Sequence, residues 1–264
     1  MEGAGKAASR QAQRHRLLTE AVMAAGTVTI EDLARTLDVS VMTVHRDLDQ
    51  LEAQNVLRKS RGAATALPSS TVESNDAYRR SQQRAEKAEL TTAAMAFVQS
   101  GQTIMLDDST TLLPLLDQLR TKAPLTVVSN SLSVTNALVD AEDVQLVLVG
   151  GEYRRWSNSF MGQMAADAIS ALHVDVMFMS TAAVIGDSCY HQQQDTVSIK
   201  RSMMSVASSK VLLVDHTKFE RRAMFRQCPL DDFDHVVVDS RTPTEVVDEM
   251  RRLGVDVTVA PRIH

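Results

Sequence analysis

The sequence predicts an α/β protein, in which a small winged helix-turn-helix domain is followed by a mainly parallel, doubly wound α/β domain. Residues 29–52 have the apolar spacing of two short helices joined by a tight turn. From residue 83 onward, helical patterns alternate with Val- and Leu-rich runs such as residues 144–149, which are typical of strands buried on both faces of a sheet. The length of 264 residues also exceeds that of one ordinary domain.

The boundary between the domains is expected at a Ser- and Thr-rich stretch, residues 68–75, which has no hydrophobic periodicity. We therefore predict a first domain at residues 1–66, a linker at residues 67–84 and a second domain at residues 85–264. Either domain is long enough to form a hydrophobic core.

Three helices are expected in the first domain. The first spans Arg14–Ala25 and stops at Gly26. The second begins after an N-cap at Thr29, and the turn Asp38–Val39 leads to a third helix with its N-cap at Ser40. A β-hairpin is predicted over residues 55–67, with its turn at Ser60 to Gly62.

The third helix has the pattern of a DNA-recognition helix. Its apolar residues recur at i, i+3, i+7 and i+10 and are predicted to form one buried stripe: Val41, Val44, Leu48 and Leu51. Arg46 points away from that stripe, and the side chains assigned to base edges are Met42, Thr43, Arg46 and Gln50. The side chains assigned to backbone phosphates include the cations of the hairpin: Ser40, His45, Arg58, Lys59 and Arg61.

The second domain is predicted to alternate helices and strands. The helices are residues 85–99, 111–120, 132–141, 162–171, 196–208 and 244–253, and the strands are residues 103–106, 125–128, 144–149, 174–179, 211–214, 235–238 and 255–259. In open α/β sheets, ligands bind beyond the carboxyl ends of the strands. The polar residues that follow each strand are therefore the candidates for a binding site.

These strand-end loops carry hydroxyls, an amide, a glycine pair and cations, the groups that hold a phosphorylated ligand at helix ends. The candidates are Asp107, Ser109, Thr110, Thr111, Asn130, Ser131, Gly150, Gly151, Arg154, Lys200, Asp215 and Lys218. Singly, such residues are more often helix caps, turns or solvated cations. Their recurrence at one edge of a sheet favours a ligand site.

Charge and composition limit the class of protein. The net charge is −5, but residues 1–66 carry nine basic and eight acidic side chains, so attraction for DNA phosphate is confined to the first domain. Dimerisation would double those contacts. The sequence has no apolar run of membrane-spanning length, no apolar signal-peptide core and only two distant cysteines, so we expect a cytoplasmic protein with no membrane segment. No catalytic residue, metal site or cofactor is assigned.

The run LDVSVMTVHRDLDQLEAQNVLRKSRGAA resembles the winged helix-turn-helix of DeoR-family transcription regulators, with Ser40, Thr43 and Arg46 matching its recognition helix. The loops LDDSTT, VVSNSL, LVGGEYRRWSNSFMG, VSIKRSM and VLLVDHTKF are similar, in order, to the effector domain of that family. The resemblance covers nearly the whole chain. It implies a cytoplasmic regulator, usually a repressor, whose sugar-phosphate-isomerase-like domain binds a phosphorylated sugar or related metabolite and changes the affinity for operator DNA.

This sequence departs from the family pattern at three places. His45 stands where the family commonly has a second arginine, Ser109 replaces a glycine of the phosphate loop, and Arg61 occurs where a Gly-Gly pair is usual in the wing. Serine restricts the backbone where glycine allows a positive φ. We therefore expect the phosphate to sit differently, or the ligand to differ from a simple sugar phosphate.

Two alternatives remain open, and a homo-oligomer is expected in either case. One is a sugar-phosphate isomerase-like enzyme with an accessory DNA-binding module, which would need a general base such as Asp107, Asp195 or Asp215. The other is a regulator with a vestigial pocket that acts only through oligomerisation. An isomerase assay and ligand-induced melting shifts would separate them.

Overall fold

The computed structural model describes residues 2–25, 27–54, 56–66, 74 and 76–263. The chain divides into two compact units, Met1–Tyr78 (unit 1) and Arg79–His264 (unit 2). Residues 67–73 and 75 of the predicted linker lie outside the described residues. Residues 76–81 form helix α4 (Asp76–Ser81) where linker was expected, with an acidic first turn and a basic last turn that suit the helix dipole. No described helix is both long and apolar enough to cross a membrane.

Unit 1 has three helices and a small antiparallel sheet in the order β1-β3-β2. Its elements are α1 (Glu2–Ala25), β1 (Thr27–Thr29), α2 (Ile30–Thr36), α3 (Val41–Ala53), β2 (Leu57–Ser60) and β3 (Ala63–Ala66). Helix α1 begins well before the predicted Arg14, and its predicted stop, Gly26, lies outside the described residues. Strand β1 was not predicted, because three residues are too short to show a period.

The two predicted N-caps of unit 1 are present. Asp32 N donates to Thr29 Oγ1 at 3.1 Å, and Thr43 N donates to Ser40 Oγ at 3.1 Å. The predicted stripe on α3 is buried at Val44, Leu48 and Leu51. The prediction for Val41 was wrong, since this side chain is 43% exposed. Val41 lies in the first turn of α3, beyond the end of the core, so the stripe starts one turn later.

Unit 2 is built on a parallel sheet of seven strands in the order β15-β14-β12-β9-β4-β5-β6. The strands are β4 (Thr103–Leu106), β5 (Leu125–Ser129), β6 (Val144–Leu148), β9 (Val174–Met179), β12 (Ala207–Val214), β14 (His235–Val238) and β15 (Val257–Val259). Every adjacent pair is parallel, which confirms the predicted sheet. β12 starts at Ala207, within the predicted helix 196–208, because helix α9 already ends at Ser205.

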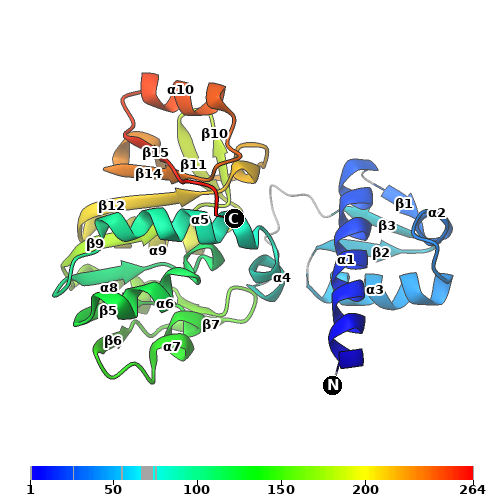
Figure 1. Ribbon diagram of the computed structural model, residues 1–264, viewed down its shortest axis with the longest axis horizontal. Helices are drawn as coiled ribbons and strands as arrows, with labels where there is room; N and C mark the ends of the chain where they lie inside the picture. The colour runs from blue at the N-terminus through cyan, green and yellow to red at the C-terminus, as the bar shows by residue number, and fades with distance from the viewer. Residues whose placement is uncertain (1, 26, 55, 67–73, 75, 264) are drawn as a thin grey trace. The chain divides into compact units, whose positions relative to one another are not determined.

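Helices cover both faces of this sheet, and α5, α6 and α7 lie along one of them (Figure 1). The helices are α5 (Arg84–Ala94), α6 (Leu115–Leu119), α7 (Leu132–Leu138), α8 (Gln163–Ser170), α9 (Gln194–Ser205) and α10 (Thr244–Arg252). Along β4, Ile104 and Leu106 pack in the core beneath α5–α7, whereas Met105 packs in the core beneath α8–α10. This alternation explains why the strands are apolar throughout.

Short elements complete unit 2. The 3₁₀ helices are η1 (Met95–Phe97), η2 (Thr110–Leu112), η3 (Arg120–Lys122), η4 (His216–Phe219) and η5 (Leu230–Asp232). The predicted helix 111–120 is divided into η2, α6 and η3, because Pro114 has no N–H to continue the helix. Unpredicted antiparallel strands form the hairpin β7 (Glu152–Arg154)–β8 (Ser159–Met161) and a sheet of β10 (Ala183–Ile185), β11 (Ser188–His191) and β13 (Phe225–Pro229).

Candidate functional site

The strand order of unit 2 has a switch point between β4 and β9. From β4 the chain proceeds outward through β5 and β6, then returns to β9 on the other side of β4 and continues through β12, β14 and β15. Connections therefore leave these two neighbouring strands in opposite directions, which opens a crevice at their carboxyl ends in folds of this kind. Asp107 follows β4 and Ser180 follows β9, so both lie at this position.

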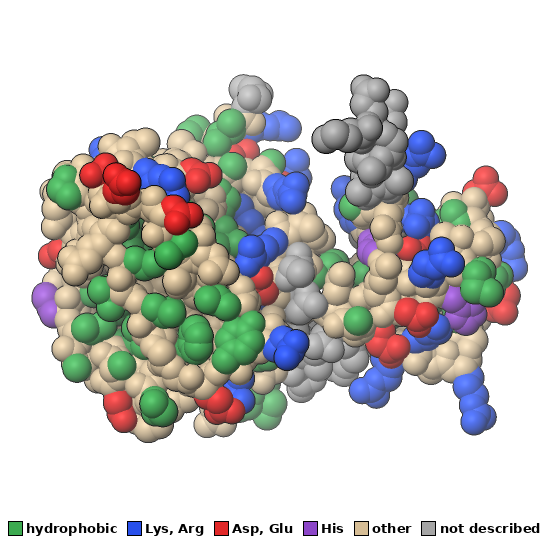
Figure 2. Space-filling view, turned by 90° about the horizontal axis from the view of Figure 1, so that it is seen from below, with side chains coloured by type: hydrophobic (Ala, Val, Ile, Leu, Met, Phe, Trp, Pro, Cys, Tyr) green, Lys and Arg blue, Asp and Glu red, His purple; other side chains and the backbone are tan. Residues whose placement is uncertain are grey.

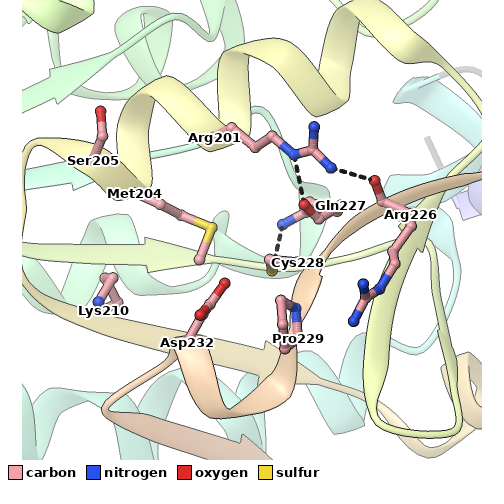
Figure 3. A pocket seen from close by; sticks show the side chains of 9 residues that line it. All are labelled: Arg201, Met204, Ser205, Lys210, Arg226, Gln227, Cys228, Pro229 and Asp232. Carbon is pink, nitrogen blue, oxygen red and sulfur yellow. Dashed lines mark hydrogen bonds between the residues drawn. The ribbon is translucent and has the colours of Figure 1, made fainter.

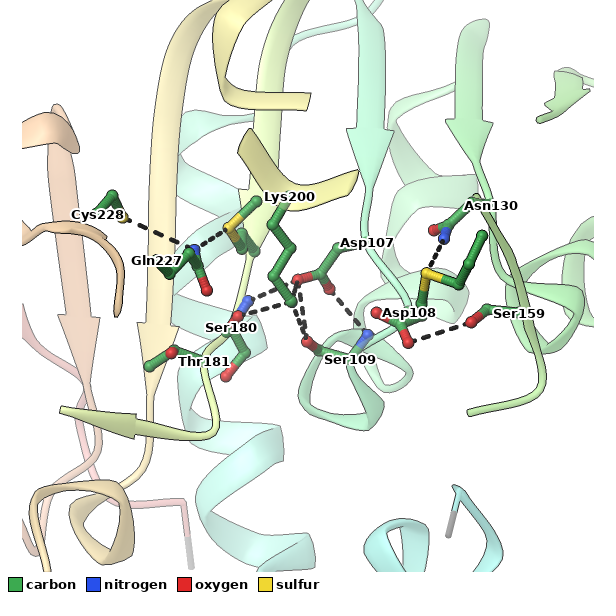
Figure 4. A network of polar contacts seen from close by, with 12 residues as sticks. Asp107, Asp108, Ser109, Asn130, Ser159, Ser180, Thr181, Lys200, Gln227 and Cys228 are labelled. Atoms are coloured by element: carbon green, nitrogen blue, oxygen red, sulfur yellow. Dashed lines mark hydrogen bonds and ion pairs between the residues drawn. The ribbon is translucent and has the colours of Figure 1, made fainter. Parts of the chain in front are cut away.

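A buried ion pair between helix α9 and the end of β4 lies at the switch point (Figure 4). Lys200 from α9 reaches Asp107, with side chains 2% and 1% exposed respectively. Lys200 Nζ also donates to Ser180 O at 2.9 Å and Ser109 Oγ at 3.2 Å, and Ser180 N donates to Asp107 Oδ2 at 3.1 Å. All three ammonium protons therefore have acceptors within the protein. Lys200, predicted to bind a ligand, fixes the relative positions of β4, β9 and α9.

Asp108 lies beside this ion pair. The sequence analysis did not include it among the candidate site residues. Burial raises the pKa of Asp108, against the lowering effect of the positive charge on Lys200. Its carboxylate accepts a hydrogen bond from Ser159 Oγ of β8 at 3.2 Å. The hairpin β7–β8 is thereby fixed to the loop after β4.

Asn130, which follows β5, is fully buried. Its Nδ2 donates to Phe160 O at 2.8 Å, while its Oδ1 has no hydrogen-bond partner. Ser180 Oγ is likewise buried and unpartnered. Buried polar atoms are nearly always satisfied, so two such atoms at the carboxyl ends of β5 and β9 mark positions where a polar ligand can complete the bonding.

Lys87 of α5 was also missed by the sequence analysis, because a single lysine in an amphipathic helix carries no distinctive pattern. It is 5% exposed and donates to Thr110 Oγ1 at 3.1 Å and to the carbonyl of Arg79. Burial lowers the pKa of Lys87, and the positive charge of Lys218 and other cations lowers it further, to about 7. Lys87 and the three cations that act on it form what we name the cation cluster: Arg79, Lys87, Lys218 and Arg221.

Asp215 is the acidic group that acts on Lys87. It is 1% exposed, caps η4 and accepts a hydrogen bond from Thr217 N at 3.1 Å. Burial acts to raise the pKa of Asp215, but the charges of Lys218 and Arg221 outweigh it, and the net shift is downward. Asp215 therefore stays ionised. The charges that act on Lys87 are three positive and one negative, an arrangement suited to an anion.

The remaining candidates of the loops after β4 and β5 have roles within the fold. Ser131 is the N-cap of α7, with its Oγ accepting from Val134 N at 3.4 Å. Thr111 is buried in η2, next to Thr110. Ser109 Oγ donates to Asp107 Oδ2 at 3.0 Å, a bond that glycine at this position could not make.

The candidates after β6 lie on or before the hairpin β7–β8. A Cβ added at Gly151 would lie 2.6 Å from Met161 O, so glycine is needed for close packing against β8. Gly150 is exposed, and a Cβ there would meet nothing within 4 Å. Arg154 forms ion pairs with Glu152 at 2.6 Å and with Asp195 of α9 at 2.8 Å, so its charge is compensated within the protein.

Lys and Arg side chains are spread over the surface of unit 1 (Figure 2), and several of the predicted recognition residues are exposed. Met42 is 70% exposed and Arg46 is exposed one turn later. Gln50 is exposed as well, but its Oε1 accepts a hydrogen bond from Gln11 Nε2 of α1 at 2.8 Å. His45 is partly buried, and Ser40 Oγ and Thr43 Oγ1 lie 2.8 Å apart at the start of α3.

The cations of the hairpin differ in their surroundings. Arg58 and Arg61 are exposed. Arg61 and Gly62 form the turn between β2 and β3, and Gly62 has the positive φ in it. Lys59 forms an ion pair with Asp49 of α3, so its charge is partly compensated. Arg58 and Arg61 are the two hairpin cations best placed for a phosphate.

A buried carboxylate fixes α3 to α1. Asp47 is 1% exposed and accepts hydrogen bonds from Arg14 Nη2 at 3.0 Å and His15 Nε2 at 3.0 Å, in addition to Arg14 Nε. Burial acts to raise the pKa of Asp47, but the bonds from Arg14 and His15 outweigh it and lower the pKa. The recognition helix is thus held in place by a charged contact that the apolar pattern did not reveal.

Comparison with known proteins agrees with both units. A model of the DeoR-like helix-turn-helix domain matches residues 14–70, and a model of the DeoR C terminal sensor domain matches residues 82–240. The chain belongs to the DeoR family of transcriptional regulators. It is 31% identical over 243 residues to the glycerol-3-phosphate regulon repressor of Escherichia coli (strain K12), covering 90% of this chain and 94% of that protein. It is 33% identical over 227 residues to the lactose phosphotransferase system repressor of Lactococcus lactis subsp. lactis, covering 85% and 89%.

This DeoR-family regulator thus combines a DNA-binding domain with a sensor domain, as the sequence predicted. The relatives are named as repressors, which favours the regulator over the enzyme alternative. Ribose 5-phosphate isomerase A from Methanocaldococcus jannaschii is a far more distant match, with a TM-score of 0.37, 16% identity and coverage of 50% of this chain and 53% of that one. A likeness at this level has no bearing on function.

Proposed function

We propose that this DeoR-family regulator is a repressor whose affinity for operator DNA is controlled by a small phosphorylated sugar or related metabolite bound at the carboxyl ends of the strands of unit 2. The cation cluster beside Thr110 is the observation that carries the proposal. A lysine that is partly neutral because it is buried, and because other cations act on it, gains most from a dianion such as a phosphate group. The name of the glycerol-3-phosphate regulon repressor is consistent with a phosphorylated ligand.

The proposed ligand has its phosphate against Lys87, Thr110 and Lys218. Its hydroxyl groups donate to Asn130 Oδ1 and bond to Ser180 Oγ, two of the buried atoms that have no hydrogen-bond partner among the described residues. Lys200 acts on this site through Asp107 and Ser109, by holding the strand ends in register. Of the strand-end residues predicted from the sequence, Arg154 and Gly151 have no direct contact with the ligand in this assignment.

The proposed DNA contacts are those of α3 and the β2–β3 turn. Met42, Thr43 and Arg46 read base edges, and Arg58 and Arg61 bind phosphates. A dimer or larger homo-oligomer doubles these contacts, which compensates for the near-neutral charge of residues 1–66.

A melting-temperature screen of the full chain against phosphorylated sugars and polyols tests the sensor. We expect a ligand at 100 times its Kd to stabilise the protein by about 2.7 kcal/mol. Lys218→Ala removes most of that shift, whereas Lys122→Ala, at an exposed lysine of η3, leaves it unchanged. Failure of the whole panel to shift the wild-type protein would favour the vestigial-pocket alternative.

Titration of duplexes selected for binding, followed by fluorescence anisotropy, tests the DNA contacts. Arg46→Ala should cost about 1–3 kcal/mol on a selected duplex and much less on a scrambled one. Arg35→Ala is the matched control, because Arg35 is an exposed arginine of α2 already paired with Asp32. An equal loss on both duplexes would reassign Arg46 to a phosphate contact.

A further inference from the structure

The two cysteines of the chain, far apart in sequence, are brought together by the fold. Cys189 of β11 and Cys228 of β13 are direct partners in an antiparallel pair, and both are free thiols. Directly opposite residues in such a pair have Cα atoms about 4.5–5.5 Å apart. Disulfides span Cα separations of about 4.4–6.8 Å, a range that includes the spacing of directly opposed residues.

The two thiols differ in their surroundings. A hydrogen bond with Cys228, together with burial, raises the pKa of Cys189, so Cys189 keeps its proton. Cys228 Sγ accepts a further hydrogen bond from Gln227 Nε2 at 3.7 Å. Cys228 thus has a polar side chain at its sulfur, whereas the sulfur of Cys189 faces Cys228.

Cys228 also lines a pocket of about 440 Å³, as Figure 3 shows, whereas Cys189 is not part of the pocket wall. Three cations and one acidic residue line it: Arg201, Lys210, Arg226 and Asp232. The pocket lining therefore carries more positive than negative side chains. A small reagent therefore reaches Cys228 first, and Cys189 only through it.

We propose that Cys228 and Cys189 form a dithiol site that reacts with hydroperoxides and closes to a cross-strand disulfide. The Cys228 sulfur attacks one oxygen of the peroxide, so that an S–O bond forms and the O–O bond breaks, and the other oxygen takes the thiol proton and leaves as water or an alcohol. The Cys189 sulfur then attacks Cys228 Sγ, so that an S–S bond forms and the S–O bond breaks. The departing hydroxide takes the Cys189 proton and leaves as water. The two thiols together lose two electrons, and the hydroperoxide gains them.

The test is treatment of the folded, full-length protein with hydrogen peroxide, followed by denaturation, alkylation with N-ethylmaleimide and intact-mass analysis. We expect both thiols to be lost together, with a mass lower by two hydrogen atoms and a Cys189–Cys228 cross-linked peptide after digestion. In Cys189→Ser, the reaction stops at a sulfenic acid on Cys228, which dimedone traps. In Cys228→Ser, thiol loss slows by at least about tenfold, because the remaining thiol is buried and protonated.

Three outcomes would overturn the proposal. One is a wild-type protein that keeps both thiols while the urea-unfolded chain loses them. Another is a disulfide that forms only between chains. The third is equal reactivity of Cys189→Ser and Cys228→Ser, which would contradict the order of attack. Circular dichroism of both variants shows whether either result reflects unfolding.

Discussion

Binding of a phosphorylated ligand should require proton uptake at Lys87. In the free protein the pKa of Lys87 is about 7, because burial and the charges of Lys218, Arg79 and Arg221 outweigh the effect of Asp215. A phosphate dianion within bonding distance would restore the pKa toward its ordinary value of about 10.4. Because the bound state then holds a proton that the free state loses above pH 7, affinity must fall as the pH rises through 7.

The size of this effect follows from the same two pKa values. Between pH 7 and pH 9 the apparent Kd should rise about fifty-fold, or ~2 kcal/mol, while the phosphate monoester itself stays a dianion. Isothermal titration calorimetry at several pH values, in buffers of different ionisation enthalpy, measures both the Kd and the protons taken up. A simple phosphate monoester is the probe if no better ligand has been found, because its second pKa of about 6 keeps it mainly a dianion over this pH range.

Two variants control this measurement. Lys87→Met should bind more weakly at pH 7 and show a flat profile from pH 7 to pH 9. Lys122→Met, at an exposed lysine, should keep the wild-type profile. If Lys87→Met retains the fifty-fold loss, the proton is taken up elsewhere and Lys87 does not contact the ligand.

Three further predictions concern stability and are checked by denaturant unfolding. Asp47→Asn should cost about 1–3 kcal/mol, since it leaves Arg14 without its buried partner, and the contribution of Asp47 in the wild type should be lost as the pH falls through its lowered pKa. Gly151→Ala should cost about 1–3 kcal/mol, whereas Gly150→Ala should stay within about 0.5 kcal/mol, and equal effects would refute the close contact. Lys200→Met should cost about 3–5 kcal/mol because it leaves a buried carboxylate unpaired, and a near-neutral result would contradict the charged pair.

The sequence predicted the sheet and the edge at which polar side chains meet, because buried parallel strands are apolar along their whole length and are followed by polar loops. The sequence could not show which side chains form ion pairs or hydrogen bonds with one another. Lys200 looked like a ligand-binding cation, yet its protons are used by Asp107, Ser109 and Ser180. The alternation of polar and apolar residues carries no information about which distant side chain a charge will meet.

The lack of information about distant contacts also explains why two buried charged residues and three short strands were not predicted. Lys87 and Asp47 each lie in a helix, where a single charged residue is normally solvated, and only the packing of other elements buries them. Strands β10, β11 and β13 are three to five residues long, and β11 pairs with a segment more than thirty residues away. A pairing of that kind leaves no local period in the chain.

Two consecutive residues of helix α9 make polar contacts with two different parts of unit 2. Lys200 enters the charged network at the switch point, and Arg201 donates to the carbonyls of Gln227 and Arg226 at 2.7 and 2.9 Å. Successive side chains on a helix diverge by about 100°, so α9 is bonded to two different parts of unit 2 at nearly the same position along its axis. A slide or rotation of α9 that lengthened one set of bonds would disturb the other, so a change at the proposed ligand site would be felt at the proposed dithiol site.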